Sequence, residues 1–200
     1  MDARHLDRAL RSASKAGLVR PRDLTARGLD RRVVYRLVAD GRLECIARGL
    51  YAVVGSVPTG DRTLAEVAAR APNCVFCLLT ALRLHELTTQ MPREVWIALP
   101  GKARIPRIAH VRLRVARFSP EGLSTDVESI RVEGVAARVT SAARTVVDCF
   151  KYRNKIGLDI ALEALREFLR TNRGGADQIA RLARRHRVAR VMQPYFEALA

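Results

Sequence analysis

The sequence lacks the features that place a protein in or across a membrane. Its 200 residues contain no uninterrupted run of about 18 apolar residues, the length that a membrane-spanning helix needs. The first residues, M-D-A-R-H-L-D-R, have no apolar core of the kind found in secretory signals. The sequence therefore predicts a cytoplasmic protein without a membrane partner.

Familiar catalytic motifs are also absent. There is no P-loop and no Gly-Ser followed by the paired aspartates with which a nucleotidyltransferase holds magnesium. A metal-dependent nuclease needs acidic residues and a lysine close together on adjacent strands. The region with strand-like patterning holds Glu94, Glu128 and Glu133 but no D/E-x-K pair. These absences predict a protein that is not an enzyme.

Cysteine is scarce, and its spacing does not complete a metal site. Of the four cysteines, Cys74 and Cys77 form a C-x-x-C, but no second such pair and no closely spaced histidine pair accompany them. Half of a zinc site and a redox pair are the functional alternatives. Packed cysteines in an apolar helix are favoured, and neither a metal nor another cofactor is predicted.

Positive charge, by contrast, is abundant. Lysine and arginine number 36 against 20 acidic residues, which gives a formal net charge of +16. Such an excess favours a polyanionic partner, because each neutralised phosphate releases condensed counterions. Only four of the basic residues are lysines, but codon usage can produce the same bias, so the preference for arginine carries little weight by itself.

The first 57 residues show the signals of three short helices followed by a hairpin. Apolar periodicity predicts a first helix over residues 2–16, ended by Gly17, and Pro21 and Gly28 bound a second. Asp30 is the predicted N-cap of a third helix that reaches Ala39 or Asp40. Two strands follow, over residues 43–46 and 50–53, with Arg48 and Gly49 at the turn between them. This order predicts a winged helix-turn-helix domain over residues 1–57.

A boundary at Pro58, Thr59 and Gly60 separates this domain from a second one over residues 61–200. The second domain is predicted to be α+β, with a small, mostly antiparallel sheet and several helices. Its expected elements are a helix over 64–70, an apolar helix over 74–87, a strand over 94–99, a half-buried antiparallel strand over 111–118, a hairpin around Glu133 and Gly134, and helices from Ser141 onward.

The third helix of the first domain has two chemically distinct faces. Val33, Val34 and Leu37 form its apolar side, and the opposite side carries basic and aromatic residues, namely Arg31, Arg32, Tyr35 and Arg36. In a helix-turn-helix the last helix lies in the major groove, where arginine donates two hydrogen bonds to guanine. A solvated amphipathic helix is the competing interpretation, but the hairpin that follows favours DNA binding.

Three further arginines belong to the same predicted interface. Arg48, at the tip of the predicted wing, is a candidate for a minor-groove or phosphate contact. Arg20 and Arg22, at the start of the second helix, are predicted to lie near the DNA backbone.

Other polar residues have simpler explanations. Ser141 is well placed as an N-cap, and Arg144 and Asp148 are spaced for an ion pair within one helix. That interpretation is preferred over a polar site at the strand-to-helix junction, and Trp96 is expected in the core. The basic cluster over residues 181–190 is a second phosphate clamp, a face for an acidic protein or a solvated surface, and helical spacing alone does not rank these.

The N-terminal sequence G-L-V-R-P-R-D-L-T-A-R-G-L-D-R-R-V-V-Y-R-L-V-A-D-G-R-L-E-C-I-A-R-G-L-Y-A-V resembles the DNA-binding domain of AbiEi-family antitoxins. The later segments E-V-W-I-A-L-P and V-T-S-A-A-R-T-V-V-D-C-F are similar to that family's C-terminal domain. The resemblance implies a type IV toxin-antitoxin or abortive-infection system. It further implies that the winged helix binds inverted repeats in its own promoter and represses the operon.

The resemblance also implies a functional partner, an AbiEii-like nucleotidyltransferase toxin that the C-terminal domain opposes without a stable complex. The family supplies no catalytic residues to transfer. The alternative is a winged-helix regulator whose second domain dimerises or senses a ligand and that has no toxin. A nuclease is the third possibility.

Overall fold

The computed structural model describes residues 3–16, 18–56, 60–108 and 110–199. The chain divides into two compact units, Met1–Pro72 with Ile130–Ala137, and Asn73–Ser129 with Arg138–Ala200. The first unit thus includes residues 61–72, which the sequence assigns to the second domain, and the domain limits at 57 and 61 stay a prediction. Gly17 as a helix end and the boundary residues Pro58 and Thr59 lie outside the described residues.

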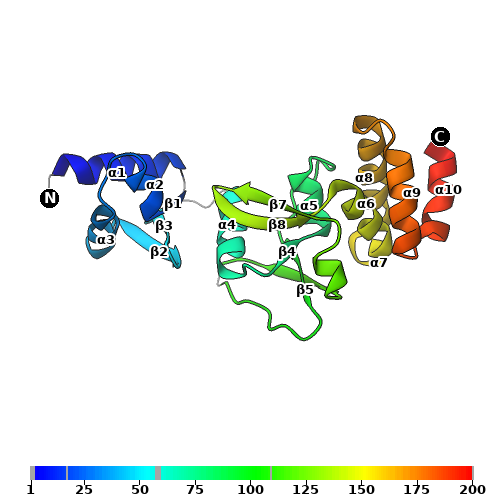
Figure 1. Cartoon of the computed structure of the whole chain (residues 1–200), viewed down its shortest axis with the longest axis horizontal. Helices are drawn as coiled ribbons and strands as arrows, with labels where there is room; N and C mark the ends of the chain where they lie inside the picture. The colour runs from blue at the N-terminus through cyan, green and yellow to red at the C-terminus, as the bar shows by residue number, and fades with distance from the viewer. Residues whose placement is uncertain (1–2, 17, 57–59, 109, 200) are drawn as a thin grey trace. The chain divides into compact units, whose positions relative to one another are not determined.

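Three short helices and a hairpin follow one another in the first unit (Figure 1). The helices are α1 (Ala3–Ala16), α2 (Pro21–Thr25), α3 (Arg32–Ala39) and, after the hairpin, α4 (Gly60–Arg70); the strands are β1 (Leu18–Val19), β2 (Leu43–Ala47) and β3 (Leu50–Val53). The predicted winged helix-turn-helix is confirmed. The sequence missed β1, which pairs antiparallel with β3 and completes a sheet of order β1-β3-β2.

The apolar side of α3 is the centre of this unit's core. Val33, Val34 and Leu37 are buried, as predicted, and they belong to one apolar cluster with residues of α1 and α2 such as Ala9 and Leu24. Fully burying one such side chain contributes about 1.5–3 kcal/mol to folding. The packing fixes which side of α3 faces outward.

The second unit is built around a five-stranded sheet of order β6-β5-β4-β8-β7. Its strands are β4 (Val75–Phe76), β5 (Val95–Pro100), β6 (Leu113–Phe118), β7 (Val127–Val132) and β8 (Val135–Thr140); its helices are α5 (Leu78–Leu84), the 3-10 helix η1 (Glu121–Leu123), α6 (Ala142–Lys151), α7 (Arg153–Ile156), α8 (Leu158–Thr171), α9 (Gly175–Arg185) and α10 (Ala189–Leu199). The tip of the hairpin formed by β7 and β8 is grouped with the first unit. The predicted α+β class is confirmed.

One strand of this sheet runs in the direction opposite to the prediction. β6 pairs with β5 in parallel, with Val95 opposite Leu113, and β4 pairs with β8 in parallel, so the sheet is mixed. The buried side chains of β6 are Ala116 and Phe118. An edge strand shows alternating burial whichever way it runs. The direction of β6 is set by residues 101–108 and 110–112, which carry the chain back to the start of β5.

The apolar helix predicted over residues 74–87 begins as a strand instead. Cys74 and Cys77 are buried, as expected, but they flank the central strand β4, and only α5 is helical. A strand that is buried on both faces has the same continuous apolar pattern as a buried helix, so periodicity does not separate the two. Leu78 turns the chain from strand to helix with a positive φ of 48°.

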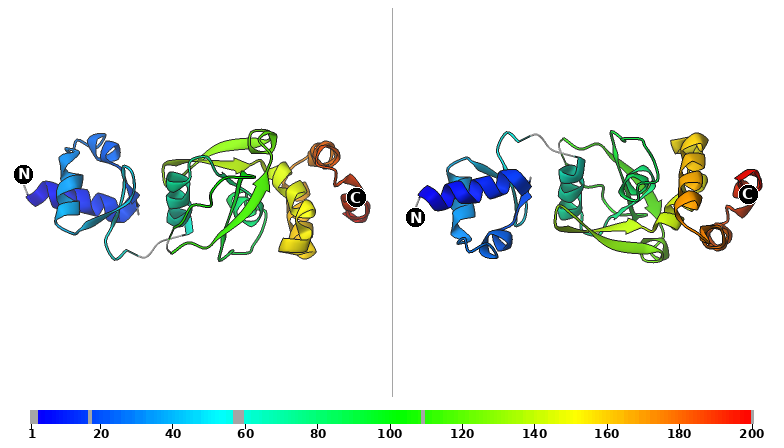
Figure 2. Two further views of the ribbon diagram at one scale, coloured as in Figure 1. Left: turned by 90° about the horizontal axis from the view of Figure 1, so that it is seen from below. Right: turned by 90° about the horizontal axis from the view of Figure 1, so that it is seen from above.

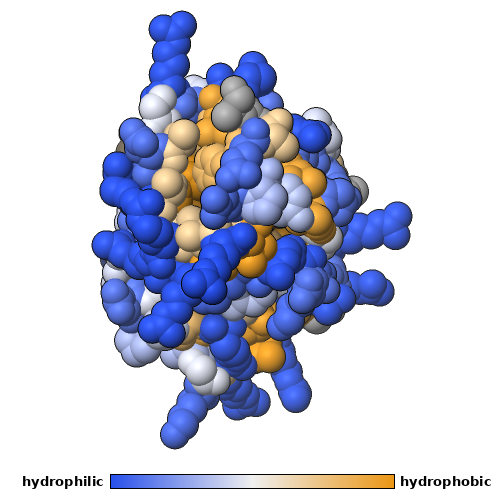
Figure 3. All heavy atoms as spheres, turned by 90° about the vertical axis from the view of Figure 1, so that its right-hand side faces the viewer, coloured by the Kyte–Doolittle hydropathy of each residue, from blue (hydrophilic) through white to orange (hydrophobic). Residues whose placement is uncertain are grey.

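Helices α6 to α10 gather at one end of the sheet (Figure 2). α6 follows β8 directly and packs against α5, α8 and α9, so its apolar residues, including Val146 and Phe150, lie at the centre of the core. Figure 3 shows hydrophobic residues (orange) between hydrophilic side chains (blue) on the face of the molecule at the C-terminal end of the chain. Met192 and Phe196 of α10 line a groove of about 270 Å³. Among the described helices, none is long and apolar enough to cross a membrane.

Candidate nucleic-acid interface

The start of α3 is fixed by a turn and a cap. Gly28 adopts a left-handed φ of 73°, a conformation that glycine enters without strain, and Leu29 is buried after it. The side chain of Asp30 accepts a hydrogen bond from the backbone N–H of Arg32 at 2.8 Å. Asp30 thus binds the first backbone N–H of α3, but the N-cap position is Arg31, one residue later than predicted, and the regular helix begins at Arg32.

The outward side of α3 carries the four predicted residues. Arg31, Arg32, Tyr35 and Arg36 are all exposed, and Tyr35 is 56% exposed, which is unusual for a large aromatic side chain. Because the opposite side is fully packed, these side chains form one continuous face. An exposed arrangement of guanidinium groups and a phenol can donate to base edges and phosphates.

The seven predicted contact residues differ in how their charges are compensated. Three arginines are paired with aspartates: Arg36 with Asp40 at 3.1 Å, Arg20 with Asp23 at 2.7 Å, and Arg22 with Asp23 at 4.0 Å. No ion pair joins Arg31, Arg32 or Arg48 to a carboxylate of the described residues. These three positive charges are available to a ligand without the loss of an existing ion pair.

Arg48 lies at the turn of the wing, as predicted. Gly49 beside it has a φ of 71°, which allows the tight turn between β2 and β3, and the strand register shifts between Cys45 and Ala47. The Arg48 side chain is exposed. The structure thus places five of the predicted residues on α3 and on the wing of one small unit, and Arg20 and Arg22 at the start of α2.

Comparison with known families agrees with this architecture. Residues 7–54 match the family model described as "Transcriptional regulator, AbiEi antitoxin". The predicted resemblance to AbiEi antitoxins is confirmed over this segment. The match covers α1 from residue 7 onward, α2, α3 and the hairpin of the first unit, and it supports a DNA-binding transcriptional regulator. No curated protein matches the chain.

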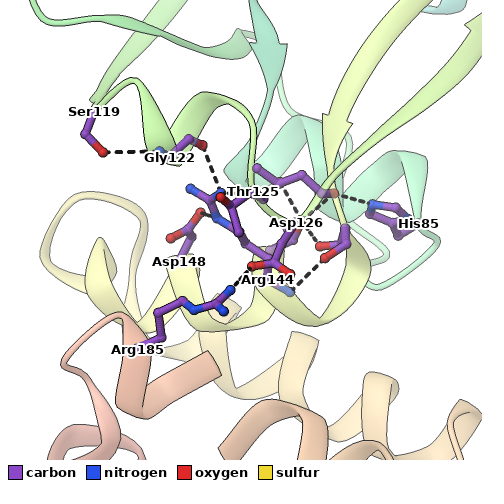
Figure 4. Close-up of polar contacts among 11 residues, drawn as sticks. His85, Ser119, Gly122, Thr125, Asp126, Arg144, Asp148 and Arg185 are labelled. Atoms are coloured by element: carbon purple, nitrogen blue, oxygen red, sulfur yellow. Dashed lines mark hydrogen bonds and ion pairs between the residues drawn. The ribbon is translucent and has the colours of Figure 1, made fainter. Parts of the chain in front are cut away.

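The second unit contains a buried polar cluster centred on Arg144 (Figure 4). Ser141 caps α6 by accepting a hydrogen bond from the backbone of Arg144 at 3.4 Å, and Arg144 pairs with Asp148 at 3.2 Å, both as predicted. The Arg144 guanidinium also donates to the carbonyl oxygens of Gly122 at 2.8 Å and Thr125 at 2.6 Å. These bonds tie α6 to the η1 segment, a connection that the spacing of residues within α6 does not reveal.

Burial controls the charge state of this cluster. The Arg144 and Asp148 side chains are 3% and 2% exposed. Loss of solvation raises the pKa of Asp148 to about 6, although the positive charge of Arg144 opposes the shift. Arg144 also lies 5.0 Å from the centre of the Phe118 ring, a cation–π contact. Trp96 is buried in the core, as expected.

Proposed function

We propose that this protein is a winged-helix repressor that binds inverted repeats in its own promoter, and that it serves as the antitoxin of a type IV toxin-antitoxin system. The observation that carries the DNA-binding part is the outward face of α3, where Arg31 and Arg32 are exposed and lack carboxylate partners among the described residues. A solvated amphipathic helix also carries exposed arginines, so the place of this helix, third in the unit and directly before the hairpin, is what favours DNA binding.

The proposed binding mode follows from the two places where exposed arginines lack a carboxylate partner among the described residues, which are the start of α3 and the tip of the wing. α3 enters the major groove with Arg32 and Arg36 directed at base edges, and Tyr35 contacts a phosphate or stacks. Arg48 on the wing reaches a phosphate or the adjacent minor groove. An inverted repeat presents the same half-site twice, so two copies of the chain bind one operator.

Electrophoretic mobility shift with the protein's own promoter fragment tests this proposal. We expect a specific shift whose affinity falls steeply with salt, because phosphate contacts release counterions. An unrelated duplex of equal length and base composition serves as the control. Equal affinity for the two duplexes at moderate salt would exclude operator recognition.

The antitoxin part of the proposal rests on the family match and concerns the second unit. We propose that this unit opposes an AbiEii-like nucleotidyltransferase toxin without a stable complex, and that the chain acts by binding and not by catalysis. The family that matches residues 7–54 is described as a transcriptional regulator and antitoxin, and this description supports the role of the chain, although the match itself lies in the first unit.

Growth rescue during toxin expression separates the antitoxin role from DNA binding. The full chain and a full-length variant with Arg31, Arg32 and Arg48 replaced by Ala are expressed beside the toxin. We expect both to rescue growth, although only the first binds the promoter. Failure of the unmodified chain to rescue would exclude the antitoxin role and leave a winged-helix regulator whose second unit dimerises or senses a ligand.

A further inference from the structure

The second unit contains a cavity that the DNA-binding proposal does not use. It has a volume of about 340 Å³ and lies between three elements: the segment that ends in η1, helix α6, and the end of α9. Ser119 and Gly122 come from the first of these, Arg144 and Lys151 from α6, and His186 and Arg187 from the residues after α9. The elements are far apart in the sequence and meet only in the folded unit.

Positive charge exceeds negative charge at this cavity. Arg144 is compensated by Asp148, and Arg185 pairs with Asp126 at 3.0 Å. Lys151 and Arg187 also line the cavity, and no carboxylate of the described residues pairs with either. Glu121 is the acidic residue of the lining, so the unpaired cations outnumber it.

The lining also offers hydrogen bond donors that the fold leaves unused. Nε of Arg144 donates to Asp148, and Nη1 donates to two carbonyl oxygens. Nη2 of Arg144 has no acceptor among the described residues. Ser119 accepts from the backbone N–H of Gly122 at 3.1 Å and keeps its own hydroxyl proton to donate. These two groups and the Lys151 ammonium point to an oxyanion as the ligand.

His186 adds a buried polar atom to the same wall. Its Nε2 is buried without a hydrogen bond partner in the described part of the chain, and a buried polar atom without a partner destabilises a folded protein. Burial lowers the pKa of His186, and the positive charges of Arg144 and Lys151 lower it further. A ligand that brings negative charge and hydrogen bonding capacity would relieve both effects.

The backbone of Arg187 adopts a left-handed conformation that residues other than glycine and asparagine seldom adopt. Arg187 comes directly after the C-cap residue of α9, His186, and has a φ of 59°, at a position where helices favour glycine or asparagine. Basic residues at helix ends are common because they offset the helix dipole, and Lys151 ends α6 in the same way. That explanation accounts for the charges, but not for the unused Arg144 and His186 atoms beside them.

We propose that this cavity binds the phosphate group of a small phosphate monoester, or free phosphate. Lys151 and Arg187 supply the charge, and Arg144 and Ser119 donate hydrogen bonds to the phosphate oxygens. The volume lies at the low end of small-molecule sites, which range over roughly 300–1,000 Å³, so the organic part of the ligand is small. The inference does not rest on the proposed operator binding.

Isothermal titration calorimetry of the full-length protein tests the site. Inorganic phosphate and glycerol 3-phosphate are titrated separately, in a chloride buffer of constant ionic strength, to distinguish the free ion from an ester. Saturable binding of one phosphate per chain by either probe is expected. Heats that do not saturate, or that sodium chloride of equal ionic strength reproduces, would overturn the proposal.

Charge removal at the cavity is compared with matched charge removal elsewhere. Lys151→Gln and Arg187→Asn are each expected to weaken phosphate binding about tenfold, the effect of losing one charge-assisted hydrogen bond near solvent. Asparagine is chosen for position 187 because it tolerates the positive φ. The controls are Lys155→Gln and Arg190→Gln, which remove the same charges outside the lining; equal weakening by variants and controls would reassign the effect to net charge.

Gly122→Ala tests the geometry while every charge is retained. A Cβ atom at this position would lie 3.5 Å from Nη2 of Arg144 and 3.3 Å from the Ser119 hydroxyl oxygen. The added methyl group therefore covers the two proposed donors. Its contacts with them are long enough that a movement of a few tenths of an ångström accommodates the methyl group. We expect phosphate binding to weaken at least tenfold with an unchanged melting temperature; unchanged phosphate affinity in this correctly folded variant would refute the assigned site.

Discussion

Replacement of Arg32 by Ala is the sharpest test of how α3 reads DNA. Arg32 has no ion pair with a described residue, and its backbone N–H remains bound to Asp30 in the variant. Alanine is the best helix former, so the fold is retained. Loss of a good bidentate base contact costs about 1–3 kcal/mol, which corresponds to a roughly five- to 150-fold weaker complex.

Asp40→Asn provides the opposite perturbation on the same helix. The ion pair of Arg36 with Asp40 is exposed, with side-chain exposures of 63% and 33%, and such helical pairs contribute about 0.3–0.5 kcal/mol. Release of Arg36 from this pair should therefore strengthen DNA binding about twofold, since 0.4 kcal/mol is roughly a factor of two. Arg36→Ala should weaken DNA binding slightly less than Arg32→Ala. In the unmodified protein Arg36 must give up its ion pair with Asp40 to contact DNA, so its net contribution to binding is smaller.

Fluorescence anisotropy with the promoter duplex and an unrelated duplex, measured over a salt series, separates the possible roles of Arg32. A base contact predicts a loss confined to the promoter, whereas a phosphate contact predicts equal losses on both duplexes and a salt slope smaller by about one. Arg173→Ala in the second unit removes the same charge and is the control. Undiminished promoter affinity in Arg32→Ala would refute the proposed orientation of α3.

Three further outcomes are expected. Arg48→Ala should weaken binding to promoter and unrelated duplexes alike and lower the salt slope by about one, as measured by the same anisotropy titrations, because a wing-tip guanidinium contacts phosphate. Leu37→Ala should lower the free energy of unfolding by about 2–5 kcal/mol in urea titrations, because Leu37 is fully buried. The pKa of Asp148 is about 6 in the folded protein and near 3.8 in the unfolded chain. The protonated carboxyl group therefore stabilises the fold fully below pH 3.8, and this stabilisation, about 3 kcal/mol, is lost as the pH rises through 6. The free energy of unfolding of the unmodified protein, minus that of Asp148→Asn, should accordingly fall between pH 4 and pH 7, and a rise would contradict the raised pKa.

The elements of the first unit could be predicted because their signals are local. Pro21, Gly28 and Asp30 mark helix limits through their own backbone preferences, and each acts within a few residues. β1 is different, since its two residues pair with Tyr51 and Ala52 far along the chain. A two-residue strand has no measurable periodicity, so only the folded hairpin defines it.

The second unit was harder to predict because its sheet depends on contacts that are distant in the sequence. The parallel pairing of β5 with β6 is decided by the path of the described residues between them, 101–108 and 110–112, and not by the pattern within either strand. The central strand β4 is apolar on both faces, and such a run is compatible with a buried helix. The hairpin at Glu133 and Gly134 was predictable, because glycine adopts the positive φ of a tight turn without strain. In the structure both residues have a positive φ, 48° for Glu133 and 72° for Gly134.

The same distinction applies to the candidate sites. The four residues on the outward side of α3 follow from helical spacing, and so does the ion pair between Arg36 and Asp40, four residues apart. The cavity beside Arg144 could not be predicted, because Lys151 ends α6 and Arg187 lies in the turn after α9, and the two approach the same space only when α6 and α9 pack together. The basic cluster after residue 180 was visible in the sequence, but its neighbours were not.

The buried Arg144 bears on why the chain has a second unit. A buried ion pair seldom stabilises a protein more than apolar residues of similar volume do, because both charges lose their solvation. The raised pKa of Asp148 shows this cost within the pair itself. Arg144 nevertheless fixes the η1 segment through two carbonyl oxygens and presents Nη2 beside the cavity. An arrangement that adds little stability and positions a donor is better explained by ligand binding than by packing, which is why the phosphate titrations address the second unit directly.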